Sequence, residues 1–210
     1  MFRRLFNPES DLMKVMTWIT DCIFLSIFWL LACIPVVTIG AATAALYDAA
    51  YHAYCRHEKN SWQRFGRSLL RNLKSSILPS IVALAVMVGA GKGLIHLWNN
   101  AVASGAWIGF SVAALVGVVV LGMLSLIFPM LSRFDNGCIQ LLVNSVRLGL
   151  GNLPRTIALG ILSALTIWMC LWYVLPLFML PCLAAVLSTI FIEPMFRPFL
   201  PEDFYGDPEE

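Results

Sequence analysis

The sequence predicts an all-α fold, a polytopic bundle of six transmembrane helices with two cytoplasmic amphipathic helices and both termini in the cytoplasm. Hydrophobic residues make up 60% of the 210 residues and charged residues only 12%, whereas ordinary soluble domains carry about 25% charged residues. The apolar residues come in long runs, and a run of roughly 18 or more is long enough to cross a bilayer as a helix. Lys and Arg gather in some of the segments between these runs and are missing from others, which predicts the orientation. We therefore expect residues 1–210 to form a single membrane domain.

Five of the six predicted spans are clearly apolar. They cover residues 15–34, 77–97, 107–131, 157–173 and 177–196. The first is longer than the roughly 7–15 apolar residues of a secretory signal, and further spans follow it, so we expect it to be retained. The six cysteines form no Cys-x-x-Cys pair. We expect them to act as small buried hydrophobes.

The sixth span, residues 38–55, is rich in small residues rather than in large apolar ones. Its predicted packing face consists of Gly40, Ala41, Ala44, Ala45, Ala49 and Ala53. Small residues at this spacing form a smooth helical ridge on which a neighbouring helix can pack closely in lipid. We expect this helix to lie inside the bundle, and a re-entrant or interfacial segment is the alternative.

The basic residues favour a crossing at residues 38–55. They lie before the first span, between residues 56 and 74, between residues 133 and 155, and at Arg197. If residues 38–55 cross the membrane, all of these cations fall on one side, and the opposite loops at 35–37, 99–105 and 174–176 carry no charge. Because cytoplasmic loops are enriched in Lys and Arg, this arrangement places both termini in the cytoplasm.

Two segments outside the spans, residues 61–76 and 138–153, are predicted to be amphipathic helices. The first has an apolar face of Trp62, Phe65, Leu69 and Leu73. Its cytoplasmic basic face consists of Arg64, Arg67, Arg71 and Lys74. Such helices often lie in the membrane interface, and a solvated linker helix is the alternative. Residues 70–77 also resemble residues 150–157, which leaves open an old internal duplication.

Besides Lys92 and His96 near the outer end of the span 77–97, four ionisable residues fall inside predicted spans, where each costs about 2.5–3.5 kcal/mol on insertion scales. They are Asp21, Asp48, His52 and Glu193. Their depths predict a polar cluster in the inner half of the bundle, serving either a substrate, ion or proton, or a structural network with Lys14 or Arg133. The sequence has no nucleotide-binding loop, zinc-ligand spacing or His-Glu-x-x-His pattern. It therefore predicts no catalytic residue, cofactor or metal.

Three stretches of sequence carry a family resemblance. They are Trp29 to Tyr47, Phe128 to Asp135 and Asn144 to Pro154. Together they resemble the YesL family of bacterial membrane proteins, a domain of unknown function often encoded beside sugar importers of the ATP-binding-cassette type. The resemblance implies a multi-pass protein of the bacterial cytoplasmic membrane with a role near carbohydrate uptake.

On this basis we expect a non-enzymatic accessory protein. Its partners would be the lipid bilayer and a sugar-importer permease, another membrane protein or a second copy of itself, and we expect no nucleic acid. The small-residue ridge and the amphipathic helices would supply the contact surfaces. The alternative is a small transporter in which Asp21 and Asp48 line the route. An intramembrane enzyme would need a nucleophile–base pair with plausible geometry, and the sequence indicates none.

Overall fold

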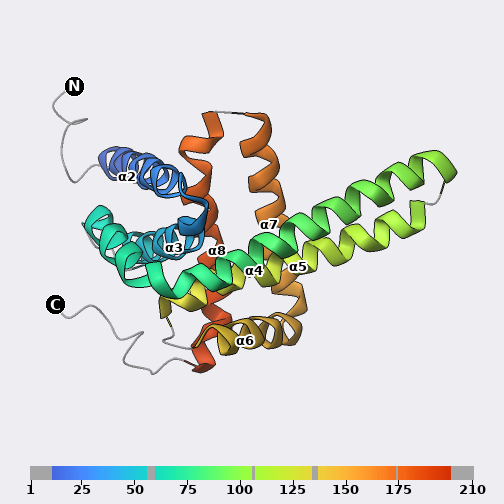
Figure 1. The fold of residues 1–210 in the computed structure, drawn as a ribbon. Coiled ribbons are helices and arrows are strands. Elements are labelled where there is room, and N and C mark those ends of the chain that lie inside the picture. The colour runs from blue at the N-terminus through green and yellow to red at the C-terminus, as the bar shows by residue number, and fades with distance from the viewer. Residues whose placement is uncertain (1–10, 56–59, 106, 134–136, 174, 200–210) are drawn as a thin grey trace.

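A computed structural model describes residues 11–55, 60–105, 107–133, 137–173 and 175–199, and every regular element in these ranges is helical (Figure 1). The α-helices are α2 (Asp11–Ala32), α3 (Ile39–Cys55), α4 (Ser61–Ser104), α5 (Trp107–Arg133), α6 (Cys138–Gly151), α7 (Leu153–Trp172) and α8 (Leu180–Phe196). Three short 3-10 helices are η1 (Val36–Thr38), η2 (Leu175–Phe178) and η3 (Arg197–Phe199). The predicted all-α class is confirmed.

Three of the described helices, α4, α5 and α7, are long and apolar enough to cross a membrane. Two shorter apolar helices cover Met16–Ala32 and Leu180–Phe196. α3 has 17 residues and therefore rises about 26 Å, slightly less than the roughly 30 Å hydrocarbon core of a bilayer. The structure thus has the helices of a membrane protein, while the count of six spans stays a prediction.

The surface of these helices is apolar. Ile108 is 83% exposed, Leu171 78% and Leu175 86%, and many other large hydrophobic side chains on α2, α4, α5 and α7 are also exposed. In water such a surface would drive aggregation. In lipid it is favourable, because the hydrocarbon chains are as apolar as the side chains.

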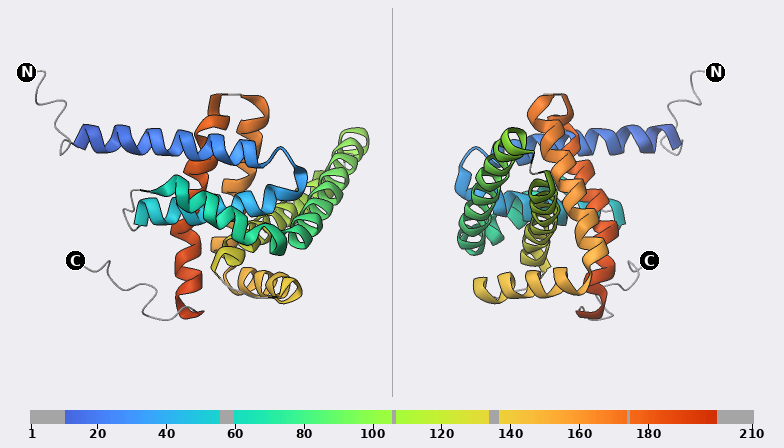
Figure 2. Two further views of the ribbon diagram at one scale, coloured as in Figure 1. Left: turned by 60° about the vertical axis from the view of Figure 1, so that its left-hand side comes forward. Right: turned by 90° about the vertical axis from the view of Figure 1, so that its right-hand side faces the viewer.

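The helices are arranged as crossed pairs rather than as a parallel bundle. α4 and α5 form a hairpin that projects from the rest of the molecule, and α7 and α8 form a second pair (Figure 1). In both views of Figure 2, α2 runs crosswise to α7 and α8. α6 lies across the base, near the start of α7. The helices within each pair run side by side, and the pairs cross one another at steep angles.

α3 is the helix at the centre of the fold, in contact with α2, α4, α5 and α8. Residues 40–42 and 44–52 are all buried. Of the predicted packing face, Gly40, Ala41, Ala44, Ala45 and Ala49 are buried and Ala53 is half-buried. The most extensive of its contacts are with α4. Other helices of the same chain cover this ridge. It is therefore not the surface for a partner protein that the sequence led us to expect.

The amphipathic segment 61–76 and the span 77–97, predicted as separate elements, form the single helix α4. No residue between them breaks the helix, and Pro79 lies buried within it. α4 changes direction between its first part and its outer part (Figure 2), and a proline is the usual cause of such a bend. Because 44 residues rise about 66 Å, α4 must extend well beyond the roughly 30 Å hydrocarbon core.

Of the predicted apolar face of this segment, Phe65 is buried in the protein and Trp62 is 58% exposed. The buried face consists of Ser61, Phe65, Ser68, Asn72, Ser76 and Ser80. Its small polar side chains let α4 approach the alanine ridge of α3 closely. A Cβ atom added to Gly40 would lie 2.0 Å from the Ser80 hydroxyl oxygen.

α5 and α7 cross at two glycines. A Cβ atom on Gly122 would lie 2.0 Å from the carbonyl oxygen of Thr156, and one on Gly160 would lie 2.0 Å from that of Val118. In each helix the two residues are four positions apart, so each glycine receives the backbone of the other helix. One turn further on, the hydroxyls of Ser125 and Ser163 are 2.7 Å apart.

The segments that resemble each other, 70–77 and 150–157, differ in structure. Residues 70–77 lie in the continuous helix α4, whereas α6 ends and α7 begins around Asn152. Pro154 occupies the position that corresponds to Lys74, and proline in the first turn suits the start of a helix. The break between α6 and α7 therefore follows from a local difference in sequence.

Candidate functional site

The charged side chains of the interior gather around the second half of α3. Asp48 and His52 lie four residues apart on one face of this helix, and Tyr47 and Tyr51 lie beside them. All four residues are buried. Each buried carboxylate in this region has a basic partner, and the partners come from α4 and α5.

Asp48 is paired with Arg64 of α4. The Arg64 Nε atom lies 3.4 Å from Asp48 Oδ2, and Arg64 Nη2 lies 2.7 Å from His52 Nε2. Because a guanidinium only donates hydrogen bonds, His52 Nε2 accepts this one, and the ring is then neutral with its proton on Nδ1. His52 Nε2 is also 3.7 Å from Asp48 Oδ1. The three side chains therefore tie α3 to the first turn of α4.

Glu193 is paired with Arg133, at the end of α5. Arg133 Nη2 donates to Glu193 Oε1 over 2.7 Å, and the Tyr47 hydroxyl donates to the same oxygen over 3.1 Å. The Arg133 guanidinium carbon also lies 3.9 Å from the centre of the Tyr51 ring, a cation–π contact. The Arg133 side chain is only 2% exposed. This second group joins α3, α5 and α8.

The structure brings together three of the four predicted cluster residues. Asp48 and His52 are in direct contact, and Glu193 reaches Tyr47, the residue before Asp48. Asp21 is not part of this group: it is exposed on α2 and has no hydrogen bond or ion pair among the described residues. The reason is rotational, because α2 buries Cys22, Leu25 and Ser26, and Asp21 lies outside that stripe.

The predicted basic face of residues 61–76 is divided in the structure. Arg64 points toward Asp48, so it belongs to the interior cluster rather than to an exposed face. Arg67, Arg71 and Lys74 are exposed, and Arg71 also donates to the Ser132 carbonyl oxygen over 3.3 Å. Three of the four basic residues thus remain available to solvent or lipid headgroups.

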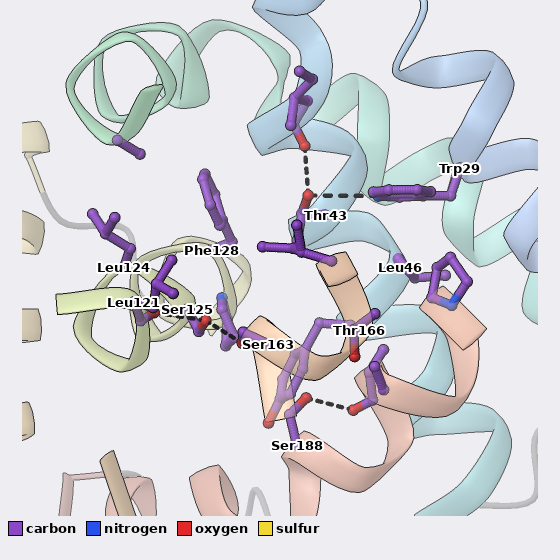
Figure 3. Close-up of a pocket in the computed structure, with 18 of the residues that line it drawn as sticks. Trp29, Thr43, Leu46, Leu121, Leu124, Ser125, Phe128, Ser163, Thr166 and Ser188 are labelled. Carbon is purple, nitrogen blue, oxygen red and sulfur yellow. Dashed lines mark hydrogen bonds between the residues drawn. The ribbon is translucent and has the colours of Figure 1, made fainter. Parts of the chain in front are cut away.

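A cavity of about 310 Å³ lies beside this cluster, between α3, α4, α5, α7 and α8 (Figure 3). Its lining is apolar apart from a few hydroxyl groups, and Tyr47 belongs both to the lining and to the Glu193 group. Among the described residues that line it there is no carboxylate, amide or basic side chain. Within the described residues, no three His, Cys, Asp or Glu side chains are placed to hold a metal ion.

Sequence analysis missed Tyr47, Tyr51 and the pairing of Arg133 with Glu193. The two tyrosines carry a signal, since they lie four residues apart on the helix that contains Asp48. The pairing of Arg133 with Glu193 leaves no signal in the sequence, because the two residues are 60 positions apart. Nothing in a single sequence shows that α5 and α8 meet there.

These features define an all-helical membrane protein whose interior charges are held in pairs around one small-residue helix. The family described as "Protein of unknown function, DUF624" matches residues 22–90. The match runs from within α2 through α3 into α4 and includes Asp48, His52 and Arg64. No curated protein matches the chain, and no solved structure matches it.

Proposed function

We propose that this protein is a non-enzymatic accessory component of the bacterial cytoplasmic membrane that binds another membrane protein, a sugar-importer permease, within the bilayer. In this proposal the chain crosses the membrane six times with both ends in the cytoplasm. The uneven distribution of Lys and Arg supports that orientation. The following observations support a binding role over a transport role.

The observation that carries the proposal is the exposed carboxylate of Asp21. It lies in the middle of α2, about 15 Å from either end of the helix. Around it the helix exposes Phe24 at 55% and Leu31 at 57%, so this face is otherwise suited to lipid. An uncompensated carboxylate costs about 2.5–3.5 kcal/mol at the bilayer centre and is also unfavourable in the inner half, where the span 15–34 places Asp21. A cation or hydroxyl group from a partner helix would remove that cost, and we infer that this face of α2 is the docking face.

The identity of the partner rests on the family resemblance. The matched residues 22–90 contain the Trp29 to Tyr47 stretch that resembles the YesL family, whose members are often encoded beside sugar importers of the ATP-binding-cassette type. All of α3 and the second half of α2 lie within that segment. The permease is therefore the first partner to test.

The alternative of a small transporter has less support. A route for a charged substrate would need charged groups facing the cavity, and none of the described lining residues is Asp, Glu, Lys or Arg. Asp48 and Glu193 face Arg64 and Arg133 instead. Their paired arrangement favours a structural role in holding α3, α4, α5 and α8 together.

The test is purification from native membranes in mild detergent, with mass spectrometry of the proteins that stay bound. We expect the permease to co-purify with the wild type and to be lost with Asp21→Asn, while the thermal unfolding midpoint stays unchanged. Trp168→Ala, at an exposed position on α7, is the control and should keep the partner. Retention of every partner by Asp21→Asn would remove the basis of the proposal, as would substrate flux in liposomes containing this protein alone.

A further inference from the structure

The cavity between α3, α4, α5, α7 and α8 presents apolar side chains and hydroxyl oxygens. The hydroxyls belong to Thr43, Tyr47, Ser80, Ser125, Ser163, Thr166 and Ser188. The labelled ones stand around the open space in Figure 3, with Trp29, Leu46 and Phe128 between them. A volume of about 310 Å³ is near the lower end of the roughly 300–1,000 Å³ found for small-molecule sites.

The protons of these hydroxyls are already used. Four of the groups donate to carbonyl oxygens of their own helices: Thr43 to Ile39, Ser80 to Ser76, Thr166 to Leu162 and Ser188 to Ala185. Ser125 donates to Leu121, so the contact between Ser125 and Ser163 takes its proton from Ser163. The Tyr47 hydroxyl donates to Glu193. The lining side chains therefore offer no free O–H donor to a ligand.

This pattern decides the chemical class of ligand. An anion needs donors or cations, and a sugar needs donors and acceptors together, since leaving its hydroxyl groups unpaired would cost free energy. A hydrocarbon chain needs neither. The lining therefore fits an apolar ligand and disfavours a sugar or a charged ligand.

The rim of the cavity is continuous with the apolar surface of the protein. Leu84 and Met87 of α4 are 44% and 40% exposed, and Ile167 of α7 is 39% exposed. All three residues also line the cavity. A lipid chain could therefore enter sideways from the bilayer, without passing any charged side chain of the lining.

We propose that this cavity binds an acyl chain of a membrane phospholipid. A free fatty acid is the less suitable source, because no Lys or Arg lines the cavity to hold its carboxylate. A phospholipid keeps its headgroup in the interface and inserts only the chain. This proposal is independent of the binding partner of α2.

The test uses the full-length protein in liposomes that contain a phospholipid with a photoreactive diazirine on one acyl chain. After irradiation, mass spectrometry locates the labelled residues. We expect labelling concentrated on cavity residues such as Phe128 and Ser163. Ala184→Phe, which places a ring in the cavity from α8, should lower this labelling about tenfold, equivalent to about 1.4 kcal/mol of binding free energy.

Leu187→Phe is the matched control, since it adds the same ring at an exposed position of α8 outside the cavity. It should leave the labelling unchanged. If Ala184→Phe lowers the unfolding midpoint, Thr166→Phe fills the cavity from α7 instead. Labelling spread evenly over the lipid-facing surface, or unaffected by either filling variant, would overturn the proposal. A parallel experiment with a diazirine-labelled fatty acid tests whether the bound acyl chain belongs to a phospholipid or to a free fatty acid. If only the fatty acid labels the cavity, the chain does not come from a phospholipid.

Discussion

Arg133 illustrates how single residues stabilise this fold. Its guanidinium is almost fully enclosed, yet it donates to Glu193 and lies against the face of Tyr51. Taking a charge out of water costs several kcal/mol, and the attraction to an opposite charge offsets that cost only where the geometry is good. A planar guanidinium is suited to such a site because it can bind a carboxylate and stack on a ring at the same time.

Removing either charge of this pair should therefore destabilise the protein. We expect Arg133→Met to lower the free energy of unfolding by about 3–5 kcal/mol, since it leaves the Glu193 carboxylate in the interior without its main partner. Thermal unfolding in detergent, followed by near-ultraviolet circular dichroism, measures the effect. The double variant Arg133→Met with Glu193→Gln should regain part of the loss. Additive losses in the double variant would show that the two charges do not depend on each other.

At the scale of helices, small residues determine which surfaces meet. α3 is enclosed because its alanines and Gly40 accept the serine-rich face of α4, and α5 crosses α7 where Gly122 and Gly160 leave room for the opposite backbone. In lipid these close contacts are a main source of helix association, since apolar side chains gain little by leaving the bilayer.

The close approach of α5 and α7 predicts that replacing either glycine at the crossing destabilises the protein. Gly122→Ala and Gly160→Ala should each lower the free energy of unfolding by about 1–3 kcal/mol, because the new methyl group meets a carbonyl oxygen that cannot rotate away. Gly89→Ala and Gly91→Ala in α4 are the controls, with nothing within 4 Å of the added atom. They should be neutral or stabilising by up to about 1 kcal/mol, through helix propensity. Equal effects at all four positions would disprove close packing at the crossing.

The bend in α4 leads to a separate prediction. Replacing Pro79 by Ala restores a backbone donor and removes the clash of the ring with the preceding turn, so α4 should straighten. Spin labels at positions 62 and 98, on the two sides of Pro79, should then move apart in pulsed electron resonance measurements. An unchanged distance would mean that the contacts with α3 and α5, and not the proline, determine the bend.

The sequence predicted the features that depend on neighbouring residues along the chain. It did not predict those that depend on contacts between distant helices. The apolar runs located the helices, and the four-residue spacing of Asp48 and His52 indicated that the two side chains share a face. The fusion of residues 61–76 with the following helix was missed because amphipathic and lipid-facing stretches differ in pattern, although no residue interrupts the helix. The inclusion of Asp21 in the cluster failed because depth in the membrane was used without the rotation of α2. Crossing angles and the Arg133–Glu193 contact depend on three-dimensional packing.

At the scale of the whole molecule, the paired charges and the apolar surface occupy different parts of the chain. The interior pairs lie where α3 meets the start of α4 and the ends of α5 and α8. The outer part of α4 and the first part of α5, as far as Val116, expose apolar side chains around the tip of their hairpin. This separation is what a protein needs if one end faces the cytoplasm and the hairpin is surrounded by lipid.

The length of α4 leads to a prediction about the orientation of the molecule in the membrane, and this prediction can be tested directly. Between Pro79 and Ser104 the helix rises about 38 Å, more than the roughly 30 Å hydrocarbon core, so Ser104 and the basic first part of α4 should lie on opposite sides of the membrane. We expect an impermeant maleimide to label Ser104→Cys in intact cells, and to label Arg67→Cys and Arg147→Cys only after permeabilisation. The native cysteines are first replaced by Ala, and each variant is checked for expression and unfolding midpoint. If Arg67→Cys and Arg147→Cys react from opposite sides, α4 and α5 do not both cross the membrane, because an odd number of crossings must then separate the two basic segments.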